Sequence, residues 1–543
     1  MNFSAALVPL SFALALLFPL SAAAAAPAAS TASKPNIVYI LCDDLGYGDV
    51  RAFNPQGKIA TPQMDRLAQE GVRFTDAHSS SSVCTPTRYG ILTGRYNWRS
   101  RLQSGVLGGL SPRLIEPGRV TVASFLQEQG YFTACVGKWH LGMDWAKHPG
   151  KTVSPLSIET VDQVGSVDYA QPIANGPRSV GFDYFFGISA SLDMVPYTYI
   201  ENDRVAALPD VPDMKFPMTA GRSGGFTRTG PGAKDFAAVD VLPTLTKKAV
   251  ELIGRHAAAA KQGKPFFLYL PLNSPHTPIN PSPAWAGQSG LSPYADFVME
   301  TDWAIGEIMR ALAAQGLDQT TLLIVTSDNG CSPQANFAEL LPLGHNPNHV
   351  FRGHKADIYD GGHHVPFLAR WTGVTPPGTR YAPYVCLTDL MATVADIVGR
   401  PLPAHAGEDS VSLLPALRGG PAPVRDTLVH HSITGAFSIR QGNWKLELCP
   451  GSGGWSAPTP GQEPKDAPRI QLYDLAADPG ETKNVQAEHP ALVARLTDLL
   501  KHQVAQGRST PGARQANTVE PDIMRGTVVA TPKKAKRAAP PAP

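Results

Sequence analysis

A cysteine in a short polar motif is the residue with the most recognisable chemistry in this chain. The segment Cys84-Thr85-Pro86-Thr87-Arg88 leads into a largely apolar run, 89–95, which predicts a helix. A thiol at the N-terminus of a helix and near an arginine is placed to react, because the helix dipole and the cation both favour negative charge. The alternative is a buried cysteine that begins an ordinary helix.

Further polar side chains follow four segments whose apolar, β-branched character is typical of buried strands. These are Asp43 and Asp44 after 36–41, Lys138 and His140 after 131–136, His276 after 265–270, and Asp328 and Asn329 after 321–326. In open α/β sheets, ligands bind at the carboxyl ends of the strands. We therefore expect these side chains to meet at one edge of a sheet.

The acidic and amide residues of this group form a set that offers only oxygen donors. Asp43, Asp44, Asp328 and Asn329 would suit Ca²⁺ or Mg²⁺ better than zinc, because these hard cations prefer oxygen ligands. The alternative is that the two pairs cap helices or shape turns. Asp49 is more typical of a turn residue after Gly48.

The basic residues complete the candidate site. Lys138, His140, His276 and Lys355 could stabilise charge on a tetrahedral oxyanion and move protons near neutral pH. Each of them taken alone is more often structural. A histidine-rich stretch, which contains His345, His349, His354, His363 and His364, does not favour zinc, because it shows no clear ligand spacing with carboxylate or cysteine.

The order of elements predicts an α/β fold with a large, mainly parallel mixed sheet sandwiched by helices. Helices are expected from residue 62, at 122–129, 242–260 and 294–315, and a loop-rich region at 144–235 is expected to line the pocket. From Arg425 the pattern changes to short alternating strands at 427–431, 437–440, 444–448 and 471–473, followed by a helix at 491–506. We predict a main domain over 34–424, a C-terminal subdomain of antiparallel sheet plus helix over 425–508, and a disordered tail over 509–543.

Composition narrows the classes of partner and compartment. The chain of 543 residues carries a net charge of +2, so no nucleic-acid partner is implied. Residues 1–26 predict a signal peptide, which indicates an exported protein, periplasmic or secreted, and no later segment predicts a membrane partner.

If Cys84 is modified, five of the six cysteines remain, so at least one stays free of a disulfide.

Together these motifs resemble the type I sulfatases, an arylsulfatase-like family of the alkaline phosphatase superfamily, over residues 34–506. The resemblance rests on Asn36 to Asp49, Cys84 to Arg95, Gly137-Lys138-Trp139-His140-Leu141-Gly142, Asn273 to Pro278, Ser327-Asp328-Asn329-Gly330, Arg352-Gly353-His354-Lys355 and Tyr359-Asp360-Gly361-Gly362. The chain departs from the family pattern at Thr87, where serine is usual, and at His364, where arginine is common.

The resemblance implies an alkaline-phosphatase-like fold and the hydrolysis of sulfate esters. It implies that Cys84 is oxidised to formylglycine by a formylglycine-generating or anaerobic maturase enzyme, and that one hydroxyl of the hydrated aldehyde attacks sulfur. Arg88 and Lys138 would hold the hydrate, and His276 or Lys355 would protonate the leaving alcohol. His140 would take the proton of the second hydroxyl as sulfate leaves.

The resemblance also implies one divalent ion per site, Ca²⁺ first and Mg²⁺ second. Its ligands would be Asp43, Asp44, Cys84 in its modified form, Asp328 and Asn329. Export and the loop-rich pocket favour a sulfated carbohydrate or other sulfated small molecule as substrate, with aryl sulfates as surrogates. Two alternatives are a phosphomonoester or phosphonate hydrolase of the same superfamily and a binding protein that retains the pocket without catalysis.

Overall fold

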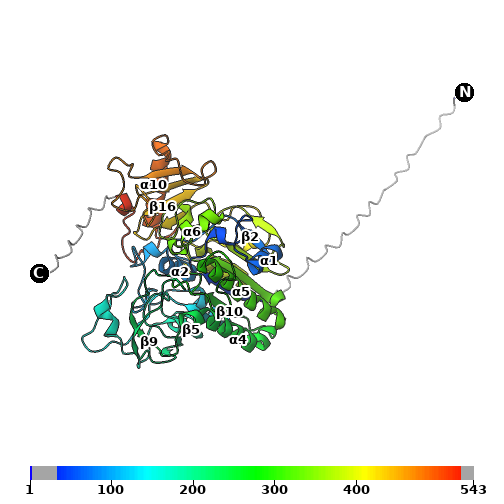
Figure 1. Cartoon of the computed structure of the whole chain (residues 1–543). Helices are drawn as coiled ribbons and strands as arrows, with labels where there is room; N and C mark the ends of the chain where they lie inside the picture. The colour runs from blue at the N-terminus through cyan, green and yellow to red at the C-terminus, as the bar shows by residue number, and fades with distance from the viewer. Residues whose placement is uncertain (3–33, 528–543) are drawn as a thin grey trace. The chain divides into compact units, whose positions relative to one another are not determined.

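A ten-stranded sheet runs through the computed structural model (Figure 1). The structure describes residues 1–2 and 34–527, and the described residues from Pro35 onward form one compact unit. The predicted signal peptide, apart from its first two residues, lies outside the described residues. The strand order in the sheet is β13-β2-β12-β11-β1-β10-β4-β5-β6-β7.

The centre of the sheet is parallel and consists of five neighbouring strands. They are β11 (Thr321–Ser327), β1 (Asn36–Cys42), β10 (Phe266–Pro271), β4 (Phe132–Lys138) and β5 (Tyr184–Ile188). Tyr39 pairs with Tyr269 on one side and Ile324 on the other. Every residue of β1, β10 and β11 is buried, which explains their continuous apolar sequences.

Antiparallel strands extend both sides of this parallel centre. β12 (Phe367–Trp371) lies antiparallel between β11 and β2 (Val72–Phe74), and β13 (Thr379–Tyr381) follows at the edge. At the other side, β6 (Ile200–Glu201) and β7 (Arg204–Val205) add two short antiparallel strands. The sheet is therefore mixed and mainly parallel, which confirms the predicted fold class.

Two groups of helices pack against the sheet. α1 (Pro62–Glu70), α4 (Val241–Lys261) and α5 (Pro293–Ala314) form one group, in which α5 contacts both α1 and α4. α2 (Cys84–Thr93), α3 (Val122–Glu128) and α8 (Leu390–Val398) form the other. The Ser292 hydroxyl caps α5 by accepting a hydrogen bond from the Ala295 N–H at 3.2 Å, and Pro293 occupies the first turn, as helix-start preferences predict.

The C-terminal part of the chain forms a separate four-stranded antiparallel sheet, coloured orange in Figure 1. Its strands are β15 (Leu428–His431), β16 (Phe437–Gln441), β17 (Trp444–Glu447) and β18 (Gln471–Asp474). Helix α10 (Pro490–Gln506) packs across β16 and β17. Leu496 and Leu500 of this helix share a hydrophobic core with Ile439 and Leu446 of the sheet.

Short elements connect these layers. They are β3 (Ala77–His78), β8 (Val211–Met214), β9 (Gly230–Gly232), β14 (Val385–Cys386), α6 (Phe337–Leu340), α7 (Asp360–His363) and α9 (Leu414–Leu417). Residues 144–235 contain short strands, two 3-10 helices (Val161–Ser166 and Pro177–Val180) and turns, in keeping with the loop-rich region expected there.

The first part of the predicted tail is in contact with the main domain. Residues 509–527 lie against the main domain: the Thr518 N–H donates to the Arg99 carbonyl at 2.7 Å, and Arg95 donates to the Ala516 carbonyl at 3.0 Å. The partners of residues 509–527 include Arg95 and Arg99, which follow α2. The polar composition of 509–527 does not predict these contacts. The rest of the predicted tail, 528–543, lies outside the described residues.

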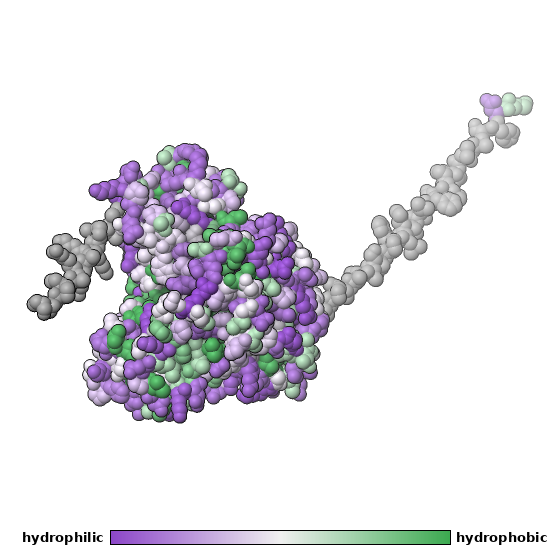
Figure 2. Space-filling view, viewed as in Figure 1, coloured by the Kyte–Doolittle hydropathy of each residue, from purple (hydrophilic) through white to green (hydrophobic). Residues whose placement is uncertain are grey.

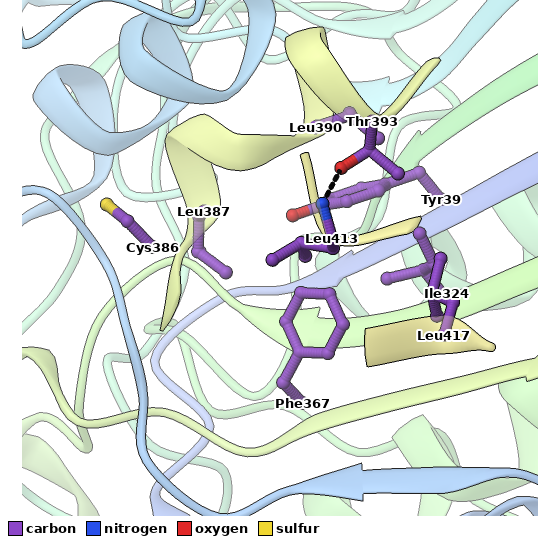
Figure 3. A pocket seen from close by; sticks show the side chains of 9 residues that line it. All are labelled: Tyr39, Ile324, Phe367, Cys386, Leu387, Leu390, Thr393, Leu413 and Leu417. Atoms are coloured by element: carbon purple, nitrogen blue, oxygen red, sulfur yellow. Dashed lines mark hydrogen bonds between the residues drawn. The ribbon is translucent and has the colours of Figure 1, made fainter. Parts of the chain in front are cut away.

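A small apolar cavity lies between the sheet and helices α8 and α9 (Figure 3). Leu390, Leu413 and Leu417 line it, and the Thr393 hydroxyl accepts a hydrogen bond from the Leu413 N–H at 2.9 Å. No side chain of the candidate site lines this cavity, so we assign it to core packing.

Hydrophobic residues on the face seen in Figure 2 lie in small groups among hydrophilic ones. Large exposed apolar side chains include Leu208 and Phe226, and some exposed apolar residues are ordinary for a protein surface. Within the described ranges, 1–2 and 34–527, no helix has the length and apolar character needed to cross a bilayer.

Candidate active site

The order of the central strands brings the predicted site residues together. β11, β1, β10 and β4 are consecutive neighbours and run parallel, so the loops that follow them meet at one edge of the sheet. Backbone hydrogen bonds join these loops: the Asp43 N–H donates to the Ser274 carbonyl at 2.9 Å, and the Asp328 N–H donates to the Cys42 carbonyl at 3.0 Å.

Buried cations hold the carboxylates that follow β1 and β11. Lys138 Nζ donates to Asp43 Oδ2 at 2.6 Å. Arg88, from α2, donates from both Nε and Nη2 to Asp328 Oδ2 at 3.1 and 2.7 Å, and its Nη1 donates to the Lys138 carbonyl at 3.0 Å. All four side chains are buried, so these contacts replace the hydration that the charges lose.

Asp43 and Asp328 differ in how readily they ionise, because their pKa values are shifted in opposite directions. Burial opposes ionisation of Asp43, but Lys138, His276 and Arg88 outweigh burial and hold the pKa of Asp43 well below its usual range. Burial and the neighbouring Asp43 carboxylate raise the pKa of Asp328 to about 7. The protein's own cations therefore stabilise the charge on Asp43 more fully than the charge on Asp328.

Asp44 joins a second group at the same edge. Lys355 Nζ lies 2.7 Å from Asp44 Oδ1 and 2.8 Å from Oδ2, and the Asn329 amide donates to Asp44 Oδ1 at 2.7 Å. Burial would lower the pKa of Lys355, but the Asp44 carboxylate raises it, so the ammonium stays charged. His276 Nε2 lies 3.7 Å from Asp44 Oδ2.

Two of the predicted residues have left-handed backbone conformations. Asp44 has φ 66° and His140 has φ 55°. This region is uncommon for residues with a side chain, although aspartate and histidine tolerate it better than most. At both residues the backbone therefore leaves the extended conformation of the preceding strand. Both residues belong to the group of polar side chains at the edge of the sheet.

Cys84 is the first residue of α2 and is buried, as are all residues of that helix. Burial raises the pKa of the Cys84 thiol, and the positive charges of Lys138 and Lys355 only partly offset this effect. The expectation of a reactive thiol next to Arg88 is therefore wrong: the Arg88 guanidinium is engaged by Asp328, and desolvation dominates. At neutral pH, Cys84 as a thiol is protonated and a poor nucleophile.

His140 presents one nitrogen without a partner. Its Nε2–H donates to the Leu107 carbonyl at 2.8 Å, and its Nδ1 is buried with no hydrogen-bond partner among the described residues. Burial, reinforced by Lys138, lowers the pKa of His140 well below its ordinary value. The neutral ring thus offers a lone pair at Nδ1. The sequence did not predict a role for Leu107, because this residue acts through its backbone carbonyl and its side chain type gives no indication of that role.

His276, like His140, is neutral. Its Nδ1–H donates to the Thr277 carbonyl at 2.6 Å, which leaves Nε2 directed towards Asp44. Burial and then the Lys355 ammonium lower the pKa of His276. The nitrogen that can gain or lose a proton is therefore Nε2.

Two buried oxygens in this group accept no hydrogen bond, although the Arg88 guanidinium lies 3.6 Å from one of them, Asp43 Oδ1. Asp43 Oδ1 and Asn329 Oδ1 have no hydrogen bond within the part of the chain that the structure describes. Asp43, Asp44 and His276 also place one ligand-type atom each within 4.8 Å of one another. Buried oxygens without a donor are costly unless a cation satisfies them. The donor set fits a hard divalent ion, because the available atoms are carboxylate and amide oxygens.

The loops that carry these residues pack closely against each other. The Lys355 N–H donates to the Cys331 carbonyl at 2.9 Å, which fixes this lysine despite its distance along the chain. At Gly330, an added Cβ would lie only 1.8 Å from the Gly361 carbonyl oxygen. The motif residues Gly330 and Gly361 are therefore required for close backbone approach.

The remaining candidates have structural roles. Asp49 accepts a hydrogen bond from the Gly46 N–H at 2.8 Å and lies 2.8 Å from His345 Nε2, so it shapes the turn after Asp44. Tyr294, which the sequence did not single out, also contacts Asp49. All six cysteines lie in the described part of the chain, and all are buried and free of disulfides.

Comparison with known proteins gives consistent matches. A family model described as Sulfatase matches residues 35–400. A protein named N-acetylgalactosamine-6-O-sulfatase from Bacteroides thetaiotaomicron is 34% identical over 514 residues, which cover 86% of this chain and 93% of the relative. Arylsulfatase A from Homo sapiens is 31% identical over 484 residues, which cover 84% of each chain.

Solved structures agree with these relatives. A Bacteroides thetaiotaomicron structure, determined in work on the metabolism of multiple glycosaminoglycans, superposes with a TM-score of 0.72 at 33% identity. The match covers 87% of this chain and 99% of the other. A protein crystallised with a neocarrahexaose has a TM-score of 0.64 at 22% identity, over 89% of this chain and 95% of that one, and shows that the fold is shared.

The contact between Arg88 and Asp328 leads to a prediction about stability. Arg88→Met leaves the buried Asp328 carboxylate without its pair, so we expect a loss of about 3–5 kcal/mol in the free energy of unfolding. Urea denaturation followed by circular dichroism measures this loss. Arg66→Met is the control: it removes an exposed i,i+4 pair with Glu70 and should cost no more than about 1 kcal/mol. Equal losses in the two variants would contradict the prediction.

Proposed function

The chain belongs to the sulfatase family and is a sulfuric ester hydrolase, and from this premise we propose that it removes sulfate from sulfated carbohydrates with a formylglycine made from Cys84. The observation that carries the proposal is the place of Cys84 at the start of α2, where Lys138 and Lys355 act on its charge. A sulfate ester bound there would meet cations on its oxygens.

Charge balance in the site supports an anionic substrate. Asp43, Asp44 and Asp328 carry three potential negative charges, and Arg88, Lys138 and Lys355 carry three positive ones. The protein groups alone are therefore close to neutral. A divalent cation would make the site net positive, which favours a sulfate ester and the charge that develops on its oxygens.

The protonated thiol of Cys84 supports its conversion to another nucleophile. In the family that the chain resembles, this cysteine becomes formylglycine, whose hydrate supplies the hydroxyl that attacks sulfur. We propose the same conversion here, with a formylglycine-generating or anaerobic maturase enzyme as the biosynthetic partner. The Cys84 Sγ then marks the position that the aldehyde oxygens would take, so Arg88 and Lys138 would act on those oxygens.

We assign the divalent ion to Asp43, Asp44, Asp328, Asn329 and the modified residue 84, with Ca²⁺ preferred and Mg²⁺ second. The two unpartnered oxygens, Asp43 Oδ1 and Asn329 Oδ1, support this assignment. Such an ion supplies Lewis-acid stabilisation of negative charge.

The two histidines have complementary roles in this proposal. His140, through its free Nδ1 lone pair, takes the proton of the second hydroxyl when sulfate is released. His276 or Lys355 gives a proton to the oxygen of the departing alcohol, so that a neutral alcohol leaves. His276 can give this proton only after Nε2 has taken one up, so in this proposal the ring is doubly protonated when the anionic substrate is bound, while the Thr277 carbonyl holds the hydrogen of the other ring nitrogen.

The relatives support our proposal for the substrate class. The Bacteroides thetaiotaomicron relative is named for N-acetylgalactosamine-6-O-sulfate esters and spans most of this chain. We therefore propose a 6-O-sulfated amino sugar of a glycan as the first substrate to test. We keep aryl sulfates as surrogates, and we propose export to the periplasm or the exterior, where sulfated glycans are found.

The modification of Cys84 is tested by mass and by activity. In protein purified from its own host, the tryptic peptide 74–88 should weigh about 18 daltons less than its cysteine form. Cys84→Ala should reduce the release of sulfate from 6-O-sulfated N-acetylgalactosamine by about 10⁴-fold or more. Cys449→Ser, a substitution of another buried cysteine outside the site, should retain activity.

The same assay tests the substrate. The 4-O-sulfated isomer and 4-nitrophenyl phosphate serve as comparison substrates. Faster release from the 4-O-sulfated isomer would refute the assignment to position 6, and faster release of phosphate than of sulfate would favour phosphomonoester hydrolysis. An unmodified thiol in fully active protein would rule out the formylglycine mechanism.

The proposed proton transfer from His276 predicts a dependence on the leaving group. His276→Ala should slow hydrolysis of the sugar sulfate by about 10²–10⁴-fold, because an alkoxide leaves poorly without a proton. Hydrolysis of 4-nitrophenyl sulfate should change much less, since nitrophenolate leaves unaided. His405→Ala, at an exposed position, is the control. An equal loss on both substrates would assign His276 to positioning rather than proton transfer.

The oxygen site predicts stabilisation by calcium. Adding Ca²⁺ to chelator-treated protein should raise the melting temperature, since a ligand at 100 times its Kd stabilises by about 2.7 kcal/mol. Asp328→Asn should abolish most of this shift. Asp409→Asn is the matched control, because Asp409 is another buried carboxylate that pairs with an arginine, Arg99 at 2.8 Å. This variant should melt earlier yet keep its calcium response; loss of the response in both variants would contradict the site.

A further inference from the structure

A hollow in the protein surface adjoins the active site on the side of His276. Its volume is about 220 Å³, the space of about seven waters at liquid density, which is enough for a single sugar ring. The segments 219–224, 292–294 and 334–339 line it together with Ile279. The side chains that would meet sulfate or metal do not line it, so the hollow begins beyond those groups.

The wall formed by Ile279 is fixed relative to His276, which precedes it by three residues. The Ile279 N–H donates to the Met218 carbonyl at 2.8 Å, and the Ala220 N–H donates to the Ile279 carbonyl at 2.9 Å. The segment that contains Ala220 is therefore bound to the chain that follows His276. In the proposed mechanism His276 gives a proton to the departing alcohol, so the alcohol must extend from sulfur on this side.

The other two walls are also joined to the active site. The Tyr294 hydroxyl, at the start of α5, donates to the Asp44 carbonyl at 3.4 Å. The segment 334–339 follows Cys331, whose carbonyl accepts the Lys355 N–H at 2.9 Å. The hollow is therefore enclosed by extensions of the loops that carry the candidate site.

An ion pair with two amides beside it makes up the polar part of the lining. Arg222 Nη2 donates to Glu339 Oε1, and Asn336 Nδ2 donates to Glu339 Oε2 at 3.2 Å. Nε and Nη1 of Arg222 have no acceptor within residues 34–527, and this side chain is 38% exposed. The Gln334 side-chain carbonyl accepts from the Ser332 hydroxyl, which leaves the Gln334 amide hydrogens available. The lining thus offers free donors next to a carboxylate that can accept.

The charges of the lining favour a neutral polar partner over an acidic one. Among the described residues that line the hollow, Arg222 and Glu339 alone are charged, and their charges cancel. A guanidinium paired with a carboxylate matches hydroxyl groups, because a hydroxyl both donates and accepts. Ile279, Pro293 and Tyr294 add apolar surface, and most ligand pockets combine such surface with a few polar groups.

We propose that this hollow binds the ring of the sulfated sugar through its hydroxyl groups, with Arg222 as donor and Glu339 as acceptor. This assignment rests on the proposed function, the hydrolysis of a sugar sulfate, and names the residues that would select a sugar over an aryl group. Hydrogen bonds to charged groups are stronger than those between neutral groups, so this pair should dominate the selection.

A structural ion pair that only fastens the segment 219–224 to 334–339 is the competing explanation. The Arg222 and Glu339 side chains are 38% and 26% exposed, and exposed pairs contribute little to stability. Both explanations therefore allow variants of the pair to fold. They differ in substrate selection, because a pair that only fastens the two segments has no contact with the sugar.

The ratio of kcat/KM for 6-O-sulfated N-acetylgalactosamine to kcat/KM for 4-nitrophenyl sulfate tests the proposal, since the aryl ester has no sugar hydroxyl. Arg222→Ala and Glu339→Ala should each lower this ratio by about 10-fold to 100-fold, the effect of one hydrogen bond to a charged group. A higher KM for the sugar sulfate should account for most of the loss. Arg310→Ala is the matched control, because Arg310 forms an exposed pair with Glu307 on α5 outside the hollow, and it should keep the wild-type ratio.

Binding without turnover gives a second readout. Calorimetry of the same sugar sulfate with Cys84→Ala protein should show weaker binding, by the same factor, when Arg222→Ala is added. If both variants keep the wild-type ratio and binding, the hollow is wrongly assigned and the pair only fastens the two segments. A loss confined to a disaccharide that contains this sugar would place the second sugar in the hollow and overturn the assignment to the sulfated ring. Wild-type protein that hydrolyses the aryl ester but not the sugar sulfate would instead refute the proposed substrate.

Discussion

Three buried carboxylates, each held by a buried cation, are the constraint on which the rest of the structure depends. Asp43, Asp44 and Asp328 could not stay charged in the interior without Lys138, Lys355 and Arg88. These six side chains come from five segments, so the chain must fix all five segments relative to one another. The parallel centre of the sheet does this for the carboxylates and Lys138, and α2 does it for Arg88 and Cys84.

Much of this arrangement could be predicted from the sequence, because strand ends and motif residues coincide. The runs 36–41, 265–270 and 321–326 are apolar on both faces, so they had to be central parallel strands. Polar residues directly after such strands must then share an edge. The helix of Cys84 followed from an equally local signal, the largely apolar run 89–95.

Other features depend on long-range contacts that leave no local pattern. The pKa of Cys84 is raised first by burial and also by the carboxylates of Asp328 and Asp43, which belong to other segments of the chain. The placement of 509–527 depends on buried arginines in a different segment.

The C-terminal sheet has a part in the active site although none of its residues lies at the edge of the main sheet. The segment after Lys355 is held from both sides: the Ala356 N–H donates to the Ser82 carbonyl at 2.8 Å, and the Ile433 N–H donates to the Ala356 carbonyl at 3.1 Å. Lys445 of β17 holds the Ile358 carbonyl at 2.9 Å. Since Ser82 lies two residues before Cys84, this segment connects Cys84, Lys355 and the C-terminal sheet. A displacement of that sheet would therefore move Lys355, whose ammonium pairs with the buried Asp44 carboxylate of the candidate site.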